Sequence, residues 1–196
     1  MNLKFSETYS DLSSDEIIAK AKQKLSTGRF EHCVRVSQTA RELAKQYGVD
    51  ENEAALAGFV HDYAKEVPVD TYIETIKTQK FDQDLLNYNR GIWHGIVGAY
   101  YIEQELKIKN PAILTAVKRH TTADTQMTDL DKIVFMADYI EPGRHFPGVE
   151  EARKQTHQSL DQGVAYQLQQ TLIYLIKNNF KVYPKTLASY NVWNVK

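Results

Sequence analysis

A histidine–aspartate pair inside an apolar helical stretch constrains the fold more than any other feature of the chain. His61 and Asp62 directly follow Phe59 and Val60, at the end of a run rich in alanine. Burying an unpaired ionisable group is costly, so such residues are normally kept off a core-facing helix. Comparable settings hold four more residues: His32, His94, His120 and Asp138. We expect several helices to bring these side chains together around a metal ion.

Helical periodicity runs through most of the 196 residues, and no alternating strand pattern or hairpin turn stands out. Capping boxes formed by Ser13 with Glu16, and by Asp50 with Glu53, start two of the predicted helices. The predicted helices cover about residues 13–25, 30–47, 50–66, 91–106, 111–120, 129–140 and 159–178, with one or two short helices within 70–86. Gly28 is expected to separate the first two, and residues 180–196 to form an irregular surface tail. We predict a single all-α domain spanning residues 1–196.

Charge and composition exclude several classes of protein. The chain has 24 basic and 25 acidic residues, a formal net charge of −1, whereas a general nucleic-acid binder normally has a basic excess. The single cysteine, Cys33, allows no intrachain disulfide and favours a reducing compartment. The N-terminus lacks the apolar core of a signal peptide, and no apolar run approaches the ~20 residues of a membrane span. We predict a cytoplasmic protein without nucleic-acid or membrane partners.

Asp138 is the strongest single indication of a metal site. It lies in the apolar segment 133–140, with Val134 and Phe135 on its own face. A buried carboxylate in such a place needs cations beside it. His61 and Asp62, taken as a pair, fit a metal site and a structural contact equally well.

The other histidines are weaker indications when taken singly. His32 alone is more typical of a packed core histidine, and His94 of a packing residue. His120 ends a predicted helix, where the macrodipole already favours a histidine. Taken together, the six residues offer imidazole nitrogen and carboxylate oxygen without thiolate. Iron, manganese, cobalt and zinc accept that ligand set, whereas magnesium alone does not account for it.

Cys33 is a further ligand candidate by its chemistry. Its side chain is expected to point ~100° away from that of the neighbouring His32 on a helix. A small buried hydrophobic residue is therefore the favoured role for Cys33.

The order of these residues resembles that of the HD-domain metal-dependent phosphohydrolases, whose pattern is a histidine, then His-Asp, then a distant aspartate. The pattern matches His32, His61–Asp62 and Asp138. His94 and His120 resemble the additional ligands of binuclear members. The resemblance implies an HD-domain helical bundle with a metal centre of one or two ions.

Longer segments resemble the bacterial YqeK-type branch of that family. They are residues 31–34, 61–65, 94–95, 120–122 and 137–144, and the likeness extends to Pro147-Gly148 and Glu151-Ala152-Arg153. Members of that branch split diadenosine tetraphosphate symmetrically into two molecules of ADP, and they contain iron. The cyclic-dinucleotide branch has a Gly-Tyr-Pro element after its His-Asp pair, which this chain lacks. The resemblance therefore implies a small nucleotide substrate and iron, although the ligand types also permit manganese, cobalt or zinc.

The same resemblance leads to a set of expected site residues. Catalytic roles are expected for Asp62, Lys65, His94, His120 and Arg144. Substrate contacts are expected for Arg29, His32, Asp62, Lys65, His94, Arg119, His120, Thr121, Thr122, Asp138, Tyr139 and Arg144. Lys65 and Arg144 are the favoured phosphate ligands, whereas Arg29 and Arg119 fit an ordinary surface charge equally well. The two threonines are equally typical of a helix end. Tyr139 and Phe146 are candidates to stack on a base, although aromatic packing is the commoner role.

Two alternative functions remain open from the sequence. One is a mononucleotide or alarmone phosphohydrolase that uses the same metal centre. The other is a nucleotide-sensing module that retains the fold without turnover. The complete ligand set argues against the second, because a scaffold has no need for Asp138 in an apolar helix. The oligomeric state is also open, a homodimer included.

Overall fold

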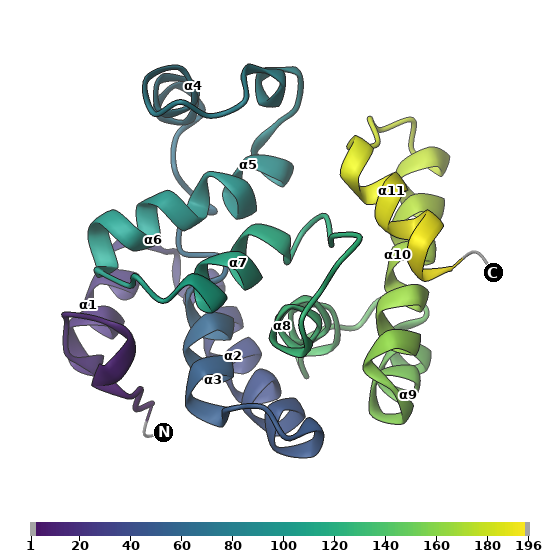
Figure 1. Ribbon diagram of the computed structural model, residues 1–196, viewed down its shortest axis with the longest axis horizontal. Helices are drawn as coiled ribbons and strands as arrows, with labels where there is room; N and C mark the ends of the chain where they lie inside the picture. The colour runs from purple at the N-terminus through teal and green to yellow at the C-terminus, as the bar shows by residue number, and fades with distance from the viewer. Residues whose placement is uncertain (1–2, 195–196) are drawn as a thin grey trace.

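The protein, described by a computed structural model over residues 3–194, is all-α (Figure 1). In that range it forms eleven α-helices and two short 3-10 helices, which confirms the predicted fold class. Predictions that include Met1, Asn2, Val195 or Lys196 lie outside the described residues. The helices are α1 (Ser14–Lys24), α2 (Thr27–Tyr47), α3 (Glu51–Val60), α4 (Val69–Thr78), α5 (Arg90–Ile96), α6 (Gly98–Leu106), α7 (Pro111–Arg119), α8 (Asp129–Ile140), α9 (Val149–Gln158), α10 (Leu160–Lys177) and α11 (Pro184–Trp193), with η1 (Glu7–Tyr9) and η2 (Gln83–Asn87).

The core lies where α2, α3, α7 and α8 pack together, near the centre of the molecule in Figure 1. Every residue of α3 from Ala54 to Val60 is buried, and α8 contributes the buried segment Ile133–Ala137. A helix that is apolar on all sides must be surrounded by other helices. Helices α9, α10 and α11 form a second group, which contacts the core through α8 (Figure 1). No helix within the described residues has the length and apolarity needed to cross a membrane.

Capping interactions set several helix starts. The Ser13 hydroxyl accepts a hydrogen bond from the Glu16 amide, and the Glu16 carboxylate accepts one from the Ser13 amide, as predicted. The Asp50 carboxylate caps α3 by accepting from two backbone amides. Glu53 was expected to complete that capping box, but its carboxylate instead accepts a hydrogen bond from Asn110, 3.0 Å away.

One predicted helix ends earlier than expected, and another is divided into two. Helix α3 stops at Val60 rather than near residue 66, and the chain continues through residues 61–66 as turns. In these turns the amides of Tyr63 and Lys65 bond to carbonyls three residues earlier, a tighter winding than an α-helix. The helix predicted for residues 91–106 is divided at Val97 into α5 and α6. Gly28 does not separate two helices, since it lies in the first turn of α2.

The C-terminal segment differs most from the prediction. Residues 184–193, expected to be irregular, form helix α11, and α9 was not predicted. Helix α11 is anchored by side chains rather than by a strong apolar stripe. The Trp193 indole donates to the Asp124 carbonyl at 2.8 Å, and the Lys185 ammonium pairs with the Asp124 carboxylate at 2.9 Å. Its helical state therefore depends on long-range contacts, which local sequence patterns do not report.

We expect Gly58→Ala to destabilise the fold by about 1–3 kcal/mol through overpacking. A Cβ atom at Gly58 would lie 3.0 Å from the Ala40 Cβ and 3.1 Å from the Val36 carbonyl oxygen. Because these atoms belong to the α2 backbone and its first side-chain carbon, α2 and α3 would have to move apart. Urea unfolding measures the change. Gly28→Ala is the matched control, because nothing lies within 4 Å of its Cβ position; equal stability of the two variants would contradict the prediction.

Candidate metal centre

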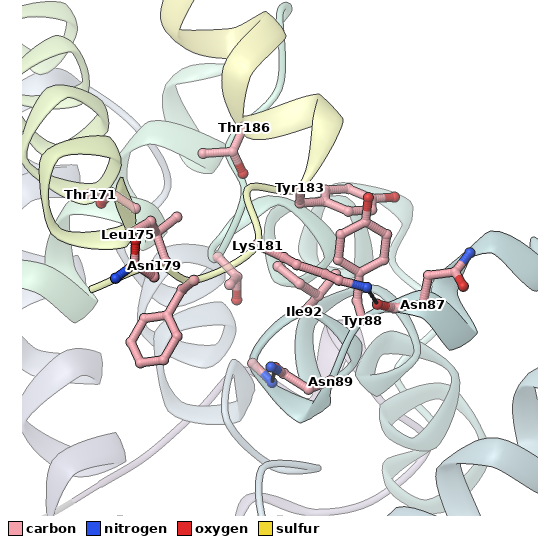
Figure 2. Close-up of a pocket in the computed structure, with 13 residues that line it drawn as sticks. Asn87, Tyr88, Asn89, Ile92, Thr171, Leu175, Asn179, Lys181, Tyr183 and Thr186 are labelled. Atoms are coloured by element: carbon pink, nitrogen blue, oxygen red, sulfur yellow. Dashed lines mark hydrogen bonds between the residues drawn. The ribbon is translucent and has the colours of Figure 1, made fainter. Parts of the chain in front are cut away.

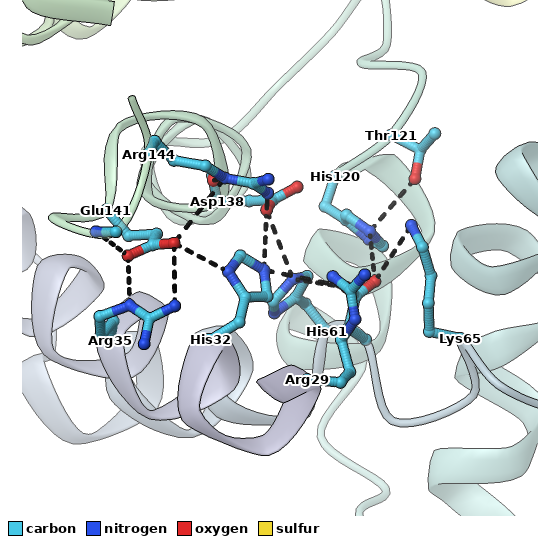
Figure 3. A network of polar contacts seen from close by, with 12 residues as sticks. Arg29, His32, Arg35, His61, Lys65, His120, Thr121, Asp138, Glu141 and Arg144 are labelled. Carbon is cyan, nitrogen blue, oxygen red and sulfur yellow. Dashed lines mark hydrogen bonds and ion pairs between the residues drawn. The ribbon is translucent and has the colours of Figure 1, made fainter. Parts of the chain in front are cut away.

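Five helices deliver the six predicted ligands to one buried place (Figure 3). His32 comes from α2 and His94 from α5, and Asp138 comes from the last turn of α8. His61 and Asp62 follow the end of α3, and His120 follows the end of α7. All are buried except Asp138, whose side chain is 23% exposed. The predicted convergence of residues far apart in the sequence is therefore observed.

One group of ligand atoms gathers between α2, α3 and α8. The His32 Nε2 atom lies 3.1 Å from Asp138 Oδ1 and 3.8 Å from Asp62 Oδ2. The His61 Nε2 atom lies 3.5 Å from Asp62 Oδ2 and 3.7 Å from Asp138 Oδ1. Two imidazoles and two carboxylates thus face one another across a space of the size that a single cation occupies.

A second group adjoins the first and shares Asp62 with it. The other oxygen of this carboxylate, Oδ1, lies 3.2 Å from His94 Nε2 and 3.7 Å from His120 Nε2. The Nε2 atoms of these two histidines are 2.9 Å apart. Each oxygen of Asp62 therefore belongs to a different cluster, an arrangement in which one carboxylate can bridge two cations.

Hydrogen bonds on the far side of each ring fix which nitrogen faces the centre. The Nδ1 atoms of His61, His94 and His120 each lie 2.7 Å from a backbone carbonyl oxygen three or four residues earlier. The Nδ1 atom of His32 lies 3.1 Å from Glu141 Oε1. When Nδ1 donates to these acceptors, each neutral ring turns the lone pair of Nε2 inward. This is the usual way in which proteins orient metal-binding histidines.

Unpaired buried atoms show that the cluster fits a cation. His32 Nε2, His61 Nε2 and Asp62 Oδ1 are buried without a hydrogen-bond partner. Leaving a buried polar atom unsatisfied costs ~1–3 kcal/mol, more for a charged group. A divalent cation satisfies all three at once, and nitrogen and oxygen donors of this kind suit a transition metal.

The electrostatics favour the metal-binding protonation states of Asp62, Asp138 and His94, whereas the Asp62 carboxylate outweighs burial and raises the pKa of His61. Burial raises the pKa of Asp62, but the His61 and His120 side chains outweigh burial and hold it well below its usual value. The pKa of Asp138 is likewise held low, because His32 and His61 outweigh burial. Burial and the Lys65 ammonium depress the pKa of His94. Charged carboxylates beside a neutral imidazole are the forms that coordinate metal.

Three cationic side chains surround the centre, each about one-third exposed (Figure 3). An Arg29 nitrogen lies 2.8 Å from Asp62 Oδ2, and an Arg144 nitrogen lies 2.5 Å from Asp138 Oδ1. The Lys65 ammonium lies 2.9 Å from His94 Nε2 and 3.6 Å from Asp62 Oδ1. Because these groups reach both the ligands and solvent, they can contact an anionic substrate at the metal centre.

Several other predicted residues have different surroundings. The Arg119 guanidinium pairs with Asp131 at 2.6 Å and with Asp124 at 3.3 Å, so it joins the end of α7 to α8. The buried Thr122 hydroxyl donates to the carbonyl of Ala123. Neither contact brings these residues to the cluster, and their expected contact with substrate stays a prediction.

The remaining candidates lie at the edges of the site. The Thr121 hydroxyl is 3.1 Å from Nε2 of both His94 and His120. Tyr139 packs against Phe146, with ring centroids 4.8 Å apart. Cys33 is fully buried in the apolar core and belongs to none of the His/Asp clusters within the described residues, in agreement with its predicted packing role.

Sequence reasoning missed a buried carboxylate behind His32. Glu141 is 1% exposed, and it accepts hydrogen bonds from Arg35 Nε at 2.6 Å and from the Gly143 amide at 2.5 Å, besides its contact with His32. Arg153 fixes the same loop by donating to three backbone carbonyls. Glu141 lies in the segment 137–144 that carries the family resemblance, but no role at the site was predicted for its side chain.

Comparisons with known proteins agree with this geometry. The profile of the HD domain matches residues 29–143, more than half of the chain. A curated "Bis(5'-nucleosyl)-tetraphosphatase, symmetrical" of Bacillus subtilis is 39% identical over 180 residues, covering 92% of this chain and 97% of the relative. A protein of the same name from Halalkalibacterium halodurans is 41% identical over 170 residues, covering 87% of this chain and 91% of the relative.

A solved structure shares the fold over nearly the whole chain. It is a crystal structure from Clostridium acetobutylicum, described as a predicted HD superfamily hydrolase involved in NAD metabolism. The two chains superpose with a TM-score of 0.89 at 31% identity, over 93% of this chain and 97% of that one. The match to the HD domain implies that the chain binds a divalent metal, and the His/Asp cluster provides the ligands for it. The chain belongs to the HD-domain family and, within it, to the family of the symmetrical bis(5'-nucleosyl)-tetraphosphatases.

Proposed function

We propose that this chain is a metal-dependent hydrolase that cleaves dinucleoside tetraphosphates symmetrically into two nucleoside diphosphates. The observation that carries the proposal is the Asp62 carboxylate, which is shared by two clusters of inward-facing Nε2 atoms. The names of the relatives, which match nearly their full length, support the same substrate class.

The six ligand residues divide between two cation sites. His32, His61, Asp62 and Asp138 hold one divalent cation, and Asp62, His94 and His120 hold a second. Iron is the metal proposed, although the donor set also accepts manganese, cobalt or zinc. When bound, such a pair of cations activates water and neutralises charge on phosphoryl oxygens.

The cationic side chains position the polyphosphate. Phosphoryl transfer depends mainly on positioning and on electrostatic stabilisation of the transferred group. Arg29 reaches the cluster from α2, Lys65 from the turns after α3, and Arg144 from the loop after α8. All three side chains are partly exposed to solvent. They hold the two inner phosphates over the ligands, with one nucleoside diphosphate on each side. With the phosphates held in this way, the cleaved bond is the one between the two inner phosphates, which gives two nucleoside diphosphates.

In the decisive experiment, the protein is purified without chelator and its bound metals are quantified. The same protein is then incubated with diadenosine tetraphosphate, and the products are identified. ADP as the sole product supports the proposal. AMP together with ATP would mean asymmetric cleavage. Turnover of mononucleotides or alarmones in its place would support the first alternative. Absence of turnover with iron, manganese and cobalt would leave a nucleotide-sensing module.

We expect Lys65→Met to lower kcat about tenfold, which corresponds to ~1.4 kcal/mol of lost transition-state stabilisation. The Lys65 ammonium is 32% exposed and 2.9 Å from His94 Nε2, so its loss removes one charge facing the phosphates while every ligand remains. Steady-state kinetics together with metal analysis test this. Lys45→Met, an exposed lysine on α2, is the control. Unchanged kcat in Lys65→Met, or lost metal, would contradict a role in positioning phosphate.

A further inference from the structure

Two cavities open beside the metal centre and neither is explained by the metal ligands. The first, here called the α5–α11 pocket, has a volume of about 650 Å³ (Figure 2). The second, the α8–α10 pocket, has a volume of about 720 Å³. The α5–α11 pocket includes Tyr88, Thr121, Thr171, Asn179, Phe180 and Tyr183 in its wall. The α8–α10 pocket includes Tyr139, Arg144, Phe146, Gln170, Tyr174 and Lys177.

Each pocket reaches the metal centre at a different end. Thr121 lines the α5–α11 pocket, and its hydroxyl is 3.1 Å from the Nε2 atoms of His94 and His120. Arg144 lines the α8–α10 pocket and contacts Asp138 at 2.5 Å. Figure 3 shows Arg144 and Thr121 at opposite ends of the row of ligands. The two pockets therefore flank the place where the phosphates are held.

Helix α10 separates the two pockets. Gln170, Tyr174 and Lys177 lie along one stripe of the helix and line the α8–α10 pocket. Leu175 begins the neighbouring stripe, about 100° around the helix from Tyr174, and lines the α5–α11 pocket. Thr171 lines both pockets. One helix thus presents a wall to each cavity.

The chemistry of both walls suits a nucleoside. Tyr88 and Tyr183 form an edge-to-face pair in the first pocket, with ring centroids 4.9 Å apart. Tyr139 and Phe146 form the equivalent pair in the second, at 4.8 Å. Stacking on aromatic side chains stabilises a bound base whatever its identity. Each pocket also contains a lysine, Lys181 in the first and Lys177 in the second.

Exposed aromatic and polar side chains line the rims of both pockets, where a ligand can reach them. Tyr174 and Phe180 are 59% and 55% exposed, although they are large and aromatic. The side chains of Gln170, Thr171 and Asn179 have no hydrogen-bond partner in the part of the chain that the structure describes. Figure 2 shows Thr171 and Asn179 on the opposite side of the α5–α11 pocket from Tyr88 and Tyr183. Tyr174 and Phe180 lie next to each other, with ring centroids 6.0 Å apart, and a contiguous exposed apolar surface is typical of a ligand-binding groove.

We propose that the α5–α11 and α8–α10 pockets hold the two nucleosides of one dinucleotide, so that α10 and α11 select dinucleoside over mononucleotide polyphosphates. This inference rests on the proposed function and deepens it. Both helices lie outside residues 29–143, the part that matches the HD domain, whereas Tyr88, Thr121 and Tyr139 in the pocket walls lie within it. Linking two bound halves raises affinity sharply when the linker matches the span between the sites. A tetraphosphate anchored at both ends places its middle bond over the metal ligands.

Binding of ADP to the metal-loaded protein tests this directly, because ADP is the product of the proposed reaction and carries one nucleoside. Calorimetry is expected to give two ADP molecules per chain. Tyr88→Ala in the first pocket and Phe146→Ala in the second are each expected to weaken one of the two ADP sites about tenfold and to leave the other unchanged. Each is also expected to raise KM for diadenosine tetraphosphate about tenfold, the size of one lost stacking contact. The effects are expected to multiply in the double variant, since the pockets share no aromatic pair.

Phe81→Ala is the matched control, because it removes one ring of a comparable edge-to-face pair, with Tyr100, that lines neither pocket. A single ADP per wild-type chain, an effect from only one of the two pocket variants, or an equal effect from Phe81→Ala would each overturn the two-pocket inference. Failure of the wild-type protein to cleave diadenosine tetraphosphate would overturn the proposed function instead. The ADP stoichiometry would still decide whether two nucleoside sites exist.

Discussion

Changing Asp62 to alanine is expected to remove bound metal and hydrolysis together. Asp62 is the one carboxylate that both ligand clusters share, with Oδ2 facing His61 and Oδ1 facing His94. Its loss would leave four inward-facing imidazoles with a single carboxylate, Asp138. Activity should fall by more than ~100-fold, since removing even a partner that only supports a metal ligand costs 10–100-fold. Elemental analysis and steady-state kinetics on the same preparation measure both quantities.

Two further variants separate the charge of Asp62 from its place in the fold. Asp62→Asn keeps the shape of the side chain but removes the negative charge, and it should also lose metal. Asp15→Ala removes an exposed carboxylate near the start of α1 and should retain both metal and turnover. A fold check by circular dichroism accompanies each. An Asp62→Ala protein that keeps its metal and its activity would remove Asp62 from the centre.

The centre of the ligand set was predictable because Asp138 and the His61–Asp62 pair broke a rule of local sequence, whereas His32, His94 and His120 gained weight only beside them. Asp138 stands in a helix whose other inward residues are apolar, and His61 follows a helix that is buried on all sides. Ionisable groups in such positions must be paired, so they have to meet one another in the fold. That argument needs no knowledge of how the helices pack. It predicts convergence but not which atoms approach.

The contacts that depend on packing were not predictable in this way. Arg119 follows the same local pattern as Arg144, since each stands close to a predicted ligand, yet Arg119 pairs with Asp131 and Arg144 with Asp138. The crossing of α7 and α8 brings Arg119 to Asp131, whereas the loop that follows α8 turns Arg144 back to Asp138. Helix α11 was missed for a similar reason, because Asp124, more than 60 residues away, anchors it through Lys185 and Trp193.

The ends of two helices orient metal-binding histidines, a role that the sequence did not indicate. His61 and His120 each stand directly after a helix, and each Nδ1 atom contacts the carbonyl oxygen three residues earlier. The last carbonyls of a helix lack a backbone donor, so a ring N–H can take its place. The early end of α3 at Val60 thus contributes to the metal centre, because it allows His61 to cap the helix through Nδ1 and to offer Nε2 to a metal.

Glu141 extends that principle to His32, whose ring has no helix-end carbonyl to bond. Burial raises the pKa of Glu141, but Arg35 and the Gly143 amide outweigh burial and keep the pKa below its usual value. The carboxylate is therefore charged when it accepts from His32 Nδ1, which orients the ring and raises the basicity of Nε2. One buried side chain thus connects a metal ligand, an arginine of α2 and the loop after α8.

Glu141→Gln is expected to weaken metal binding by about 10–100-fold, the usual cost of losing a carboxylate behind a metal-binding histidine. The amide keeps the volume but has one acceptor oxygen for the three donors on His32, Arg35 and Gly143. Competition with a chelator measures the affinity, and thermal unfolding checks the fold. Glu42→Gln, an exposed glutamate on the same helix as His32, should bind metal like the wild type. If Glu141→Gln binds metal equally well, helix packing alone orients His32, and the role of Glu141 is confined to closing the loop through Gly143.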